Sequence, residues 1–175
     1  MFKTSIDSEL SLALVQESFA PMYEEIVHNQ TDYLSQWLAW PPHCQSEQDF
    51  RIFVQRCLNE YAEGKSMTCA IWYQDRLVGN CSFNSINHDL GKVIIGYWLS
   101  QPEQGKGIMS RVVTKLADIA FNELDMQKVE AHVAVDNQPS RQLCERLGFQ
   151  YEGTITRAEN LNGRIIDHAI YGLQR

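Results

Sequence analysis

The sequence lacks the patterns that mark membrane-spanning, metal-binding or disulfide-stabilised proteins. Within its 175 residues, no apolar run approaches the roughly 18 residues needed to cross a bilayer. The five cysteines are widely spaced without a Cys-x-x-Cys pair, and the five histidines show no His-x-x-x-His spacing. The start of the sequence carries no secretory signal pattern. We therefore expect a reduced, cytoplasmic protein with no bound metal and no membrane partner.

Positive charge is also scarce. The chain has 15 Lys and Arg against 22 Asp and Glu, a net charge of −7 and a pI near 5.2. Since nucleic acids and anionic membranes usually require a basic face, we expect no binding to either, whereas a cationic substrate is permitted. With 44% hydrophobic residues and no repeat, low-complexity tract or linker, residues 1–175 are expected to form a single domain.

The order of the predicted elements indicates a mixed α/β sheet protein. Apolar residues recur at helical spacing from Gly107 onward, and Ser46-Glu47-Gln48-Asp49 resembles a capping box ahead of an amphipathic helix that ends at Gly64. We expect strands at residues 10–16, 67–73, 77–84, 93–99, 128–135, 149–157 and 164–173, the last two joined by a turn at Asn162-Gly163. Two short helices separated by a turn are expected between Pro21 and Pro41, and a further helix opened by Pro139.

The segment Gln104-Gly105-Lys106-Gly107-Ile108-Met109 lies between a predicted strand and the helix that follows it. The start of a helix offers unpaired N–H groups and a partial positive charge, which stabilise a phosphate. Glycines at positions 105 and 107 let those donors approach a pyrophosphate without an intervening Cβ. The alternative is an ordinary glycine-containing loop that merely starts a helix.

Two common nucleotide-binding loops do not fit this segment. A Walker loop is disfavoured because Gly107, not Ser or Thr, follows Lys106, and because Ser100 occupies the position of its first glycine. A Rossmann fingerprint fails because its third glycine would fall on Ser110.

A second polar constellation, Asp136-Asn137-Gln138-Pro139-Ser140, follows the strand predicted at residues 128–135. An amide and a hydroxyl at such a strand-to-helix transition can point towards a ligand that lies across the first helix start. The alternative is simple capping, because Asn and Ser are favoured at helix starts for local hydrogen bonding.

Taken together, the order strand, glycine turn, helix, strand, Asn-x-x-Ser, helix and Gly-Phe resembles the GNAT acetyltransferases. The family's Gln/Arg-x-x-Gly-x-Gly/Ala signature maps onto residues 104–109, where Met109 departs from the usual small residue. The match is closer to the ribosomal-protein-serine (RimL-like) acetyltransferase subfamily and covers nearly the whole chain. Residues 35–41 (SQWLAWP), 96–99 (GYWL), 135–137 (VDN) and 158–163 (AENLNG) carry this resemblance.

This resemblance implies the GNAT acyl-CoA N-acyltransferase fold, a mostly antiparallel sheet whose strands at residues 93–99 and 128–135 splay apart to admit pantetheine. It implies acetyl-CoA as co-substrate, with its pyrophosphate on the backbone of residues 104–109. Asn137 would help to hold the cofactor, and an N–H near Leu99 would polarise the thioester carbonyl. Ser140 is the implied acid that protonates the CoA thiolate. Glu159 is the implied base, and its alternative is a solvated carboxylate ahead of a hairpin turn.

The acceptor implied by the resemblance is the N-terminal amine of a ribosomal protein, and a homodimer is expected. A small polyamine or aminoglycoside acceptor stays open, as does a non-catalytic CoA-binding module. Four aromatic residues could line an acceptor groove, although aromatic residues at such spacing favour core positions for at least half of them. These four are Trp37, Trp40, Tyr97 and Trp98.

Overall fold

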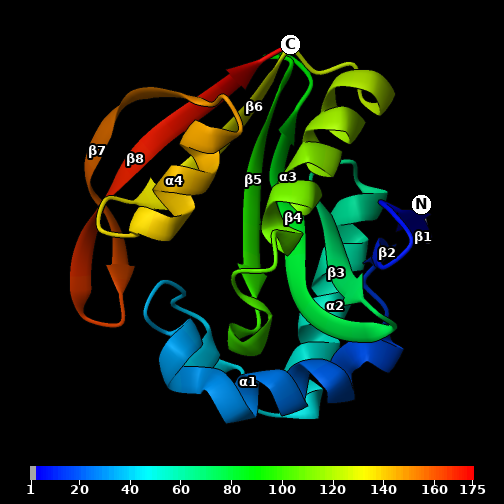
Figure 1. The fold of residues 1–175 in the computed structure, drawn as a ribbon. Helices are drawn as coiled ribbons and strands as arrows, with labels where there is room; N and C mark the ends of the chain where they lie inside the picture. Colours follow the sequence, from blue (N-terminus) through cyan, green and yellow to red (C-terminus); the bar gives the residue numbers. More distant parts are fainter. Residues whose placement is uncertain (1–2) are drawn as a thin grey trace.

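In the computed structural model, which describes residues 3–175, eight strands form one sheet in the order β1-β2-β3-β4-β5-β6-β8-β7 (Figure 1). Neighbouring strands are antiparallel except β5 and β6, which are parallel, so the expected mixed and mostly antiparallel sheet is confirmed. The strands are β1 Lys3–Ser5, β2 Leu10–Leu14, β3 Met67–Tyr73, β4 Arg76–Asn87, β5 Lys92–Leu99, β6 Lys128–Ala134, β7 Gln150–Leu161 and β8 Arg164–Gln174.

Helices cover both faces of the sheet (Figure 1). Helices α1 (Ala20–Leu34) and α2 (Glu47–Ala62) pack on one face, around a core that includes Tyr23 and Phe50. Helices α3 (Ile108–Asp118) and α4 (Gln138–Arg146) pack on the other face in a second core. No helix within residues 3–175 is both long and apolar enough to span a membrane.

Most predicted elements are present, with differences at their ends. The capping box of α2 is confirmed: Asp49 N–H donates to Ser46 Oγ (3.2 Å), and Ser46 N–H donates to the Asp49 carboxylate (2.9 Å). The turn at Asn162-Gly163 is confirmed by positive φ angles of 51° and 94°. Strand β1 was not predicted, because three mostly exposed residues carry too little periodicity to be recognised.

The two short helices expected between Pro21 and Pro41 are present as the two segments of α1, joined by a kink in place of the expected turn. The kink lies at Gln30, whose backbone is not helical (φ −136°, ψ 22°). The hydroxyl of Thr31 donates to the carbonyl of Val27 (2.7 Å), a local bond of the kind that bends helices without ending them. The helical stripe therefore breaks at Gln30 while the helix continues to Leu34.

Strands β5 and β6 pair only over their first halves. Their parallel register ends at Ile95 and Ala131. Beyond that point, Gly96–Leu99 stay paired with β4, whereas residues 132–134 stay paired with β8. The two strands therefore diverge towards the starts of α3 and α4, which confirms the expected splay and leaves backbone groups of both strands free for a ligand.

Candidate active site

Two cavities meet at the free end of β5. The first, which we call the loop cavity, has a volume of about 690 Å³ and lies against the 103–110 segment and the start of α4. The second, the α2 groove, has a volume of about 620 Å³ and lies between α2 and strands β3 to β5. Both are lined by Leu38, Tyr97 and Trp98. A group bound in one cavity can therefore contact a group bound in the other at this point.

The loop cavity brings together most of the predicted cofactor residues. Its lining includes Leu99, Gln104, Gly105, Gly107, Ile108, Met109, Asn137 and Ser140. The side chain of Lys106 is directed elsewhere, because its ammonium binds the buried carboxylate of Glu103 (2.7 Å), which also binds Arg76 (3.1 Å). These ion pairs fix the loop through Glu103. Only the backbone of residue 106 is then left to contribute to cofactor binding.

Gly105 and Gly107 adopt left-handed conformations, with φ of 77° and 69°. A Cβ at either position would meet no atom within 4 Å, so the backbone conformation requires glycine here, not close packing. Gly107 is the N-cap of α3, and the first intrahelical donor is the N–H of Arg111, which bonds Gly107 O (3.4 Å). The preceding N–H groups of the first turn are the ones that a helix leaves available to a phosphate.

A bulky residue at Gly107 is expected to weaken acetyl-CoA binding. In Gly107→Val, the branched side chain would occupy the open space above the helix start and obstruct access to its backbone donors. Gly64→Val is a matched control, because Gly64 has the same φ of 69°, equally open surroundings and a position beyond the end of α2. Calorimetry should show a several-fold weaker acetyl-CoA affinity for Gly107→Val than for Gly64→Val. Equal affinities would place the pyrophosphate elsewhere.

The kink in α1 anchors the start of the cofactor loop. The Gln30 side chain donates to Ser100 Oγ (2.8 Å) and accepts from the N–H of Gln101 (2.8 Å). Sequence reasoning missed this residue, since a glutamine in an amphipathic helix gives no sign that it reaches a loop 70 residues away.

Ser140 and Tyr97 form a hydroxyl pair at the junction of the two cavities, with 2.8 Å between their oxygens. Asn137 is the N-cap of α4 and accepts from the N–H of Ser140 (3.3 Å), so the capping role that was weighed for this segment belongs to Asn137. The Ser140 hydroxyl lies in the third helical position and contacts Tyr97 on β5. Sequence reasoning treated Tyr97 only as a groove or core aromatic residue and missed this pairing.

Burial controls the protonation states around this pair. It raises the pKa of the Tyr97 phenol above its ordinary value, so the hydroxyl stays protonated at neutral pH. The Cys144 thiol lies 3.9 Å from the Tyr97 oxygen, and burial raises its pKa to about 11. Cys144 is therefore an unreactive neighbour, as expected for most of the cysteines. Four of the five are buried, and Cys44 is half-buried.

Glu159 lies outside the lining of both cavities. It is on β7, where its carboxylate is 3.0 Å from His168 Nε2 on β8. Ala169 packs in the core beneath α3 and α4, so the alternation of a strand directs His168 to the opposite face of the sheet. The structure thus places Glu159 beside a histidine, His168, that the sequence had not indicated.

The four aromatic residues all line a cavity. Trp37 lines the loop cavity, Trp40 lines the α2 groove, and Tyr97 and Trp98 line both. Three of them, Trp40, Tyr97 and Trp98, also pack against a core while staying partly exposed, which agrees with the expectation that at least half belong to the core. Aromatic side chains can pack with one face and line a ligand site with the other, and their sequence spacing does not distinguish these roles.

The tip of the β7–β8 hairpin fixes the loop that carries Trp37 and Trp40. Asn162 Nδ2 donates to the carbonyl of Ala39 (3.1 Å), and its Oδ1 is 3.1 Å from His43 Nε2. Arg164 donates to the carbonyl of Gln36 (2.7 Å). The hairpin therefore closes the acceptor side of the site across more than 100 residues of sequence.

The geometry described above matches a known family. The family model described as an acetyltransferase (GNAT) domain matches residues 10–150. The chain belongs to the GNAT acetyltransferase family. It is 34% identical over 167 residues to the ribosomal-protein-serine acetyltransferase of Escherichia coli, covering 95% of this chain and 93% of that protein. The chain is thus an acetyl-CoA-dependent N-acetyltransferase with the GNAT fold.

Solved structures of relatives contain the cofactor. RimL, a ribosomal L7/L12 α-N-protein acetyltransferase in complex with coenzyme A, has a TM-score of 0.94 and 30% identity, covering 98% of this chain and 97% of that chain. The microcin C7 self-immunity acetyltransferase MccE, in complex with acetyl-CoA and AMP, has a TM-score of 0.93 and 27% identity, covering 97% and 94%. The open glycine turn and the splayed strands of this acetyltransferase fit such a group. Among residues 3–175, no cluster of three or more His, Cys, Asp or Glu side chains is arranged to hold a metal ion.

Proposed function

We propose that this acetyltransferase transfers an acetyl group from acetyl-CoA to the N-terminal amine of a ribosomal protein, by direct attack in a ternary complex. The observation that carries the proposal is the junction of the loop cavity and the α2 groove at Tyr97 and Trp98, which allows donor and acceptor to be bound together. The likeness to the ribosomal-protein-serine acetyltransferase over nearly the whole chain supports the choice of acceptor.

In this proposal the loop cavity holds the donor. The backbone of residues 104–109 binds the pyrophosphate, and Asn137 lies beside it at the start of α4. Pantetheine pairs with the free backbone of the splayed strands, and an N–H near Leu99 stabilises negative charge on the thioester oxygen. Met109 occupies the position where the family usually has a small residue. It lines the same cavity and contributes its backbone N–H group.

The chemistry needs one proton to leave the amine and one to reach the thiolate. The amine nitrogen forms a bond to the carbonyl carbon, and the bond from that carbon to sulfur breaks. Because Glu159 lies outside both cavities, it takes the amine proton through a water, while His168 orients its carboxylate. Ser140 donates its hydroxyl proton to the departing sulfur and can be reprotonated by Tyr97. An α-amine with a pKa of about 7.7 to 8 is partly neutral at pH 7, so a modest base suffices.

The acceptor class has a second candidate, a small polyamine or an aminoglycoside. The α2 groove contains two carboxylates, Asp49 and Glu60, and the chain is acidic overall, both of which favour a cationic acceptor. We also propose, from the sequence resemblance and composition, that residues 1–175 act as one domain in a cytoplasmic homodimer.

Turnover and binding measurements test the proposed function. One acetyl-CoA per chain should bind and raise the melting temperature, because a ligand that binds only the folded state stabilises it by about 2.7 kcal/mol at 100 times its Kd. CoA release should then be measured with serine-initiated peptides, spermidine and kanamycin as acceptors. Peptide turnover supports the proposal, and turnover of only the small amines supports the second candidate. Cofactor binding without any turnover would indicate a non-catalytic module.

A further inference from the structure

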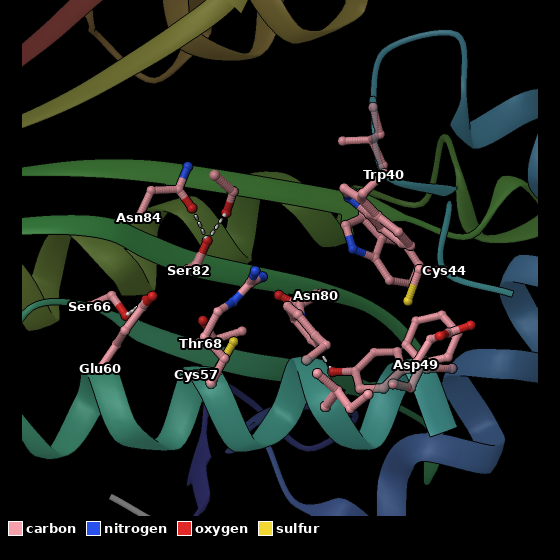
Figure 2. Close-up of a pocket in the computed structure, with 18 of the residues that line it drawn as sticks. Trp40, Cys44, Asp49, Cys57, Glu60, Ser66, Thr68, Asn80, Ser82 and Asn84 are labelled. Carbon is pink, nitrogen blue, oxygen red and sulfur yellow. Dashed lines mark hydrogen bonds between the residues drawn. The ribbon is translucent and has the colours of Figure 1, made fainter. Parts of the chain in front are cut away.

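The α2 groove is an elongated channel with one polar wall. Along α2, the side chains of Asp49, Phe53, Arg56, Cys57 and Glu60 recur at helical spacing on the groove side. Figure 2 shows this lining running from Trp40 and Cys44 at one end to Glu60 and Ser66 at the other. Opposite α2, the lining residues of strands β3 and β4, together with Ser66, which precedes β3, all carry hydroxyl or amide side chains, namely Ser66, Thr68, Asn80, Ser82 and Asn84.

An irregularity in β4 shapes the polar wall. The register of β4 against β5 shifts between Phe83 and Ser85, which leaves Asn84 unpaired in the ladder. The Asn84 amide lies over Gly96, where a Cβ would come within 2.5 Å of its nitrogen. Its oxygen accepts from the hydroxyl of Ser82 (2.6 Å). The bulge and the glycine together place an amide in the groove, next to the strand that carries Tyr97.

The channel continues beyond the end of α2. A third cavity, of about 570 Å³, shares Glu60, Ser66 and Asn84 with the α2 groove and opens beside Lys65. Asn80 pairs with Trp98 at the cavity junction, and Asn84 lies four residues further along β4. At about 3.3 Å per residue, this separation is roughly 13 Å. An extended acceptor of about four residues therefore reaches from the junction to Asn84, which lines the same two cavities as Glu60.

Glu60 is the carboxylate that is available at the far end. It is half-buried, accepts one bond from the hydroxyl of Ser66 (2.9 Å), and takes part in none of the ion pairs within residues 3–175. Asp49 is committed to the capping box. The exposed Arg56 lies over the ring of Phe53, 5.9 Å from its centroid. Lys65 pairs with Glu63, whose contact raises the pKa of the Lys65 ammonium, and the more distant charge of Glu60 acts on it less strongly. A partly desolvated carboxylate of this kind is stabilised by a cation supplied from outside.

We propose that the α2 groove selects acceptor amines that carry a second cationic group about 13 Å from the reacting amine, and that Glu60 binds that group. A peptide with a basic residue near its fourth position satisfies this requirement, and so does a polyamine. The proposal rests on the proposed function in that the acceptor enters through this groove, and it adds the chemical class that the groove recognises.

A set of matched peptides tests this recognition. Three serine-initiated peptides should carry Lys, the neutral isostere norleucine, or Glu at position four, and a fourth should carry Lys only at position eight. The wild-type protein should show a kcat/KM at least about tenfold higher for Lys than for norleucine at position four, the size of one charge-assisted contact, and no such preference for Lys at position eight. Spermidine, which has a second cationic group, and butylamine, which lacks one, form the corresponding small-molecule pair. Comparing this pair with the peptides shows whether the groove accepts a polyamine, a basic peptide or both.

Variants identify the side chain that binds the second cationic group of the acceptor. Glu60→Gln keeps the shape and a hydrogen-bond acceptor for Ser66, and it should reduce the Lys-to-norleucine ratio to near one. Glu25→Gln on the exposed side of α1 removes the same charge and should leave the ratio intact. Because a ratio does not depend on the active fraction, partial misfolding does not affect it.

Equilibrium binding of the same peptides to the CoA complex gives a readout that is independent of turnover. If no acceptor is acetylated, the proposed function fails, and the binding ratio still decides whether Glu60 selects a cation. Equal binding of the Lys and norleucine peptides, or a preference that survives in Glu60→Gln, overturns the inference. A preference for Glu at position four that Arg56→Gln abolishes also overturns the inference, since Arg56 would then be the residue that binds the side chain at position four.

Discussion

Replacing Ser140 with alanine is expected to lower kcat by roughly tenfold to a thousandfold, while acetyl-CoA affinity changes little. The reason is that the hydroxyl acts only when the carbon–sulfur bond breaks and a thiolate must be protonated. Ser140 lines the loop cavity, and its Oγ is 2.8 Å from the buried phenol of Tyr97, which lines both cavities and stays protonated at neutral pH. Steady-state kinetics and calorimetry on one preparation separate the loss of chemistry from any loss of binding.

Asn137→Ala is the comparison variant for the stability effect of losing the helix cap, and only its unfolding midpoint is used in the comparison, because Asn137 also lines the loop cavity. Asn137 caps α4, so its removal should cost about 1 kcal/mol of stability and lower the unfolding midpoint. Ser140→Ala should lower the stability and the unfolding midpoint less than Asn137→Ala does, because only the backbone of Ser140 takes part in the cap. A normal kcat in folded Ser140→Ala would remove this hydroxyl from the mechanism. If Tyr97 and Ser140 serve one proton transfer, Tyr97→Phe should add little to the loss already caused by Ser140→Ala.

Glu159→Gln is expected to lower kcat/KM by about a hundredfold to ten-thousandfold near pH 7, the range for loss of a general base. The deficit should shrink as the pH rises above about 8, because a terminal amine is then already neutral and needs no base. This pH dependence distinguishes a lost base from a distorted fold, which would depress activity equally at every pH. The measurement is a pH profile of kcat/KM between pH 6 and pH 9.5.

Glu152→Gln is the control for Glu159→Gln. Glu152 is on the same strand, and its exposed carboxylate pairs with Lys128 (2.6 Å), a type of contact that contributes little to stability. It should keep a kcat/KM near that of the wild type. Similar activities for the two variants would show that Glu159 is only a carboxylate held by His168 ahead of the hairpin turn.

Local features were predictable because neighbouring residues alone specify them. The capping box of α2 involves residues three apart, and the turn at Asn162-Gly163 requires two positive φ angles that Asn and Gly adopt easily. The left-handed glycines 105 and 107 and the start of α3 are of the same kind. Most strand and helix positions, and hence the order of elements on which the family resemblance depends, follow from such short-range patterns.

Other features depended on contacts between distant segments. Gln30 meets Ser100 across 70 residues, and Tyr97 meets Ser140 across 43, so neither contact leaves a periodic trace in the sequence. Lys106 was predicted to contribute its backbone, and only the structure shows that its side chain binds the buried carboxylate of Glu103, which needs a cation. Glu159 was placed near the reaction by resemblance, and only the fold showed that it lies outside the lining of both cavities, with its carboxylate 3.0 Å from His168 Nε2.

The sequence by itself therefore determined most of the elements, the glycine turn before α3 and the family, because periodicity, capping and glycine conformation are decided within a few residues of the chain. Only the tertiary structure decided which side chains share a cavity. Strand register and the splay of β5 from β6 bring Tyr97 to Ser140, and the bulge over Gly96 brings Asn84 towards Glu60. These pairings follow from how the whole sheet packs against its helices, and no local stretch of sequence encodes them.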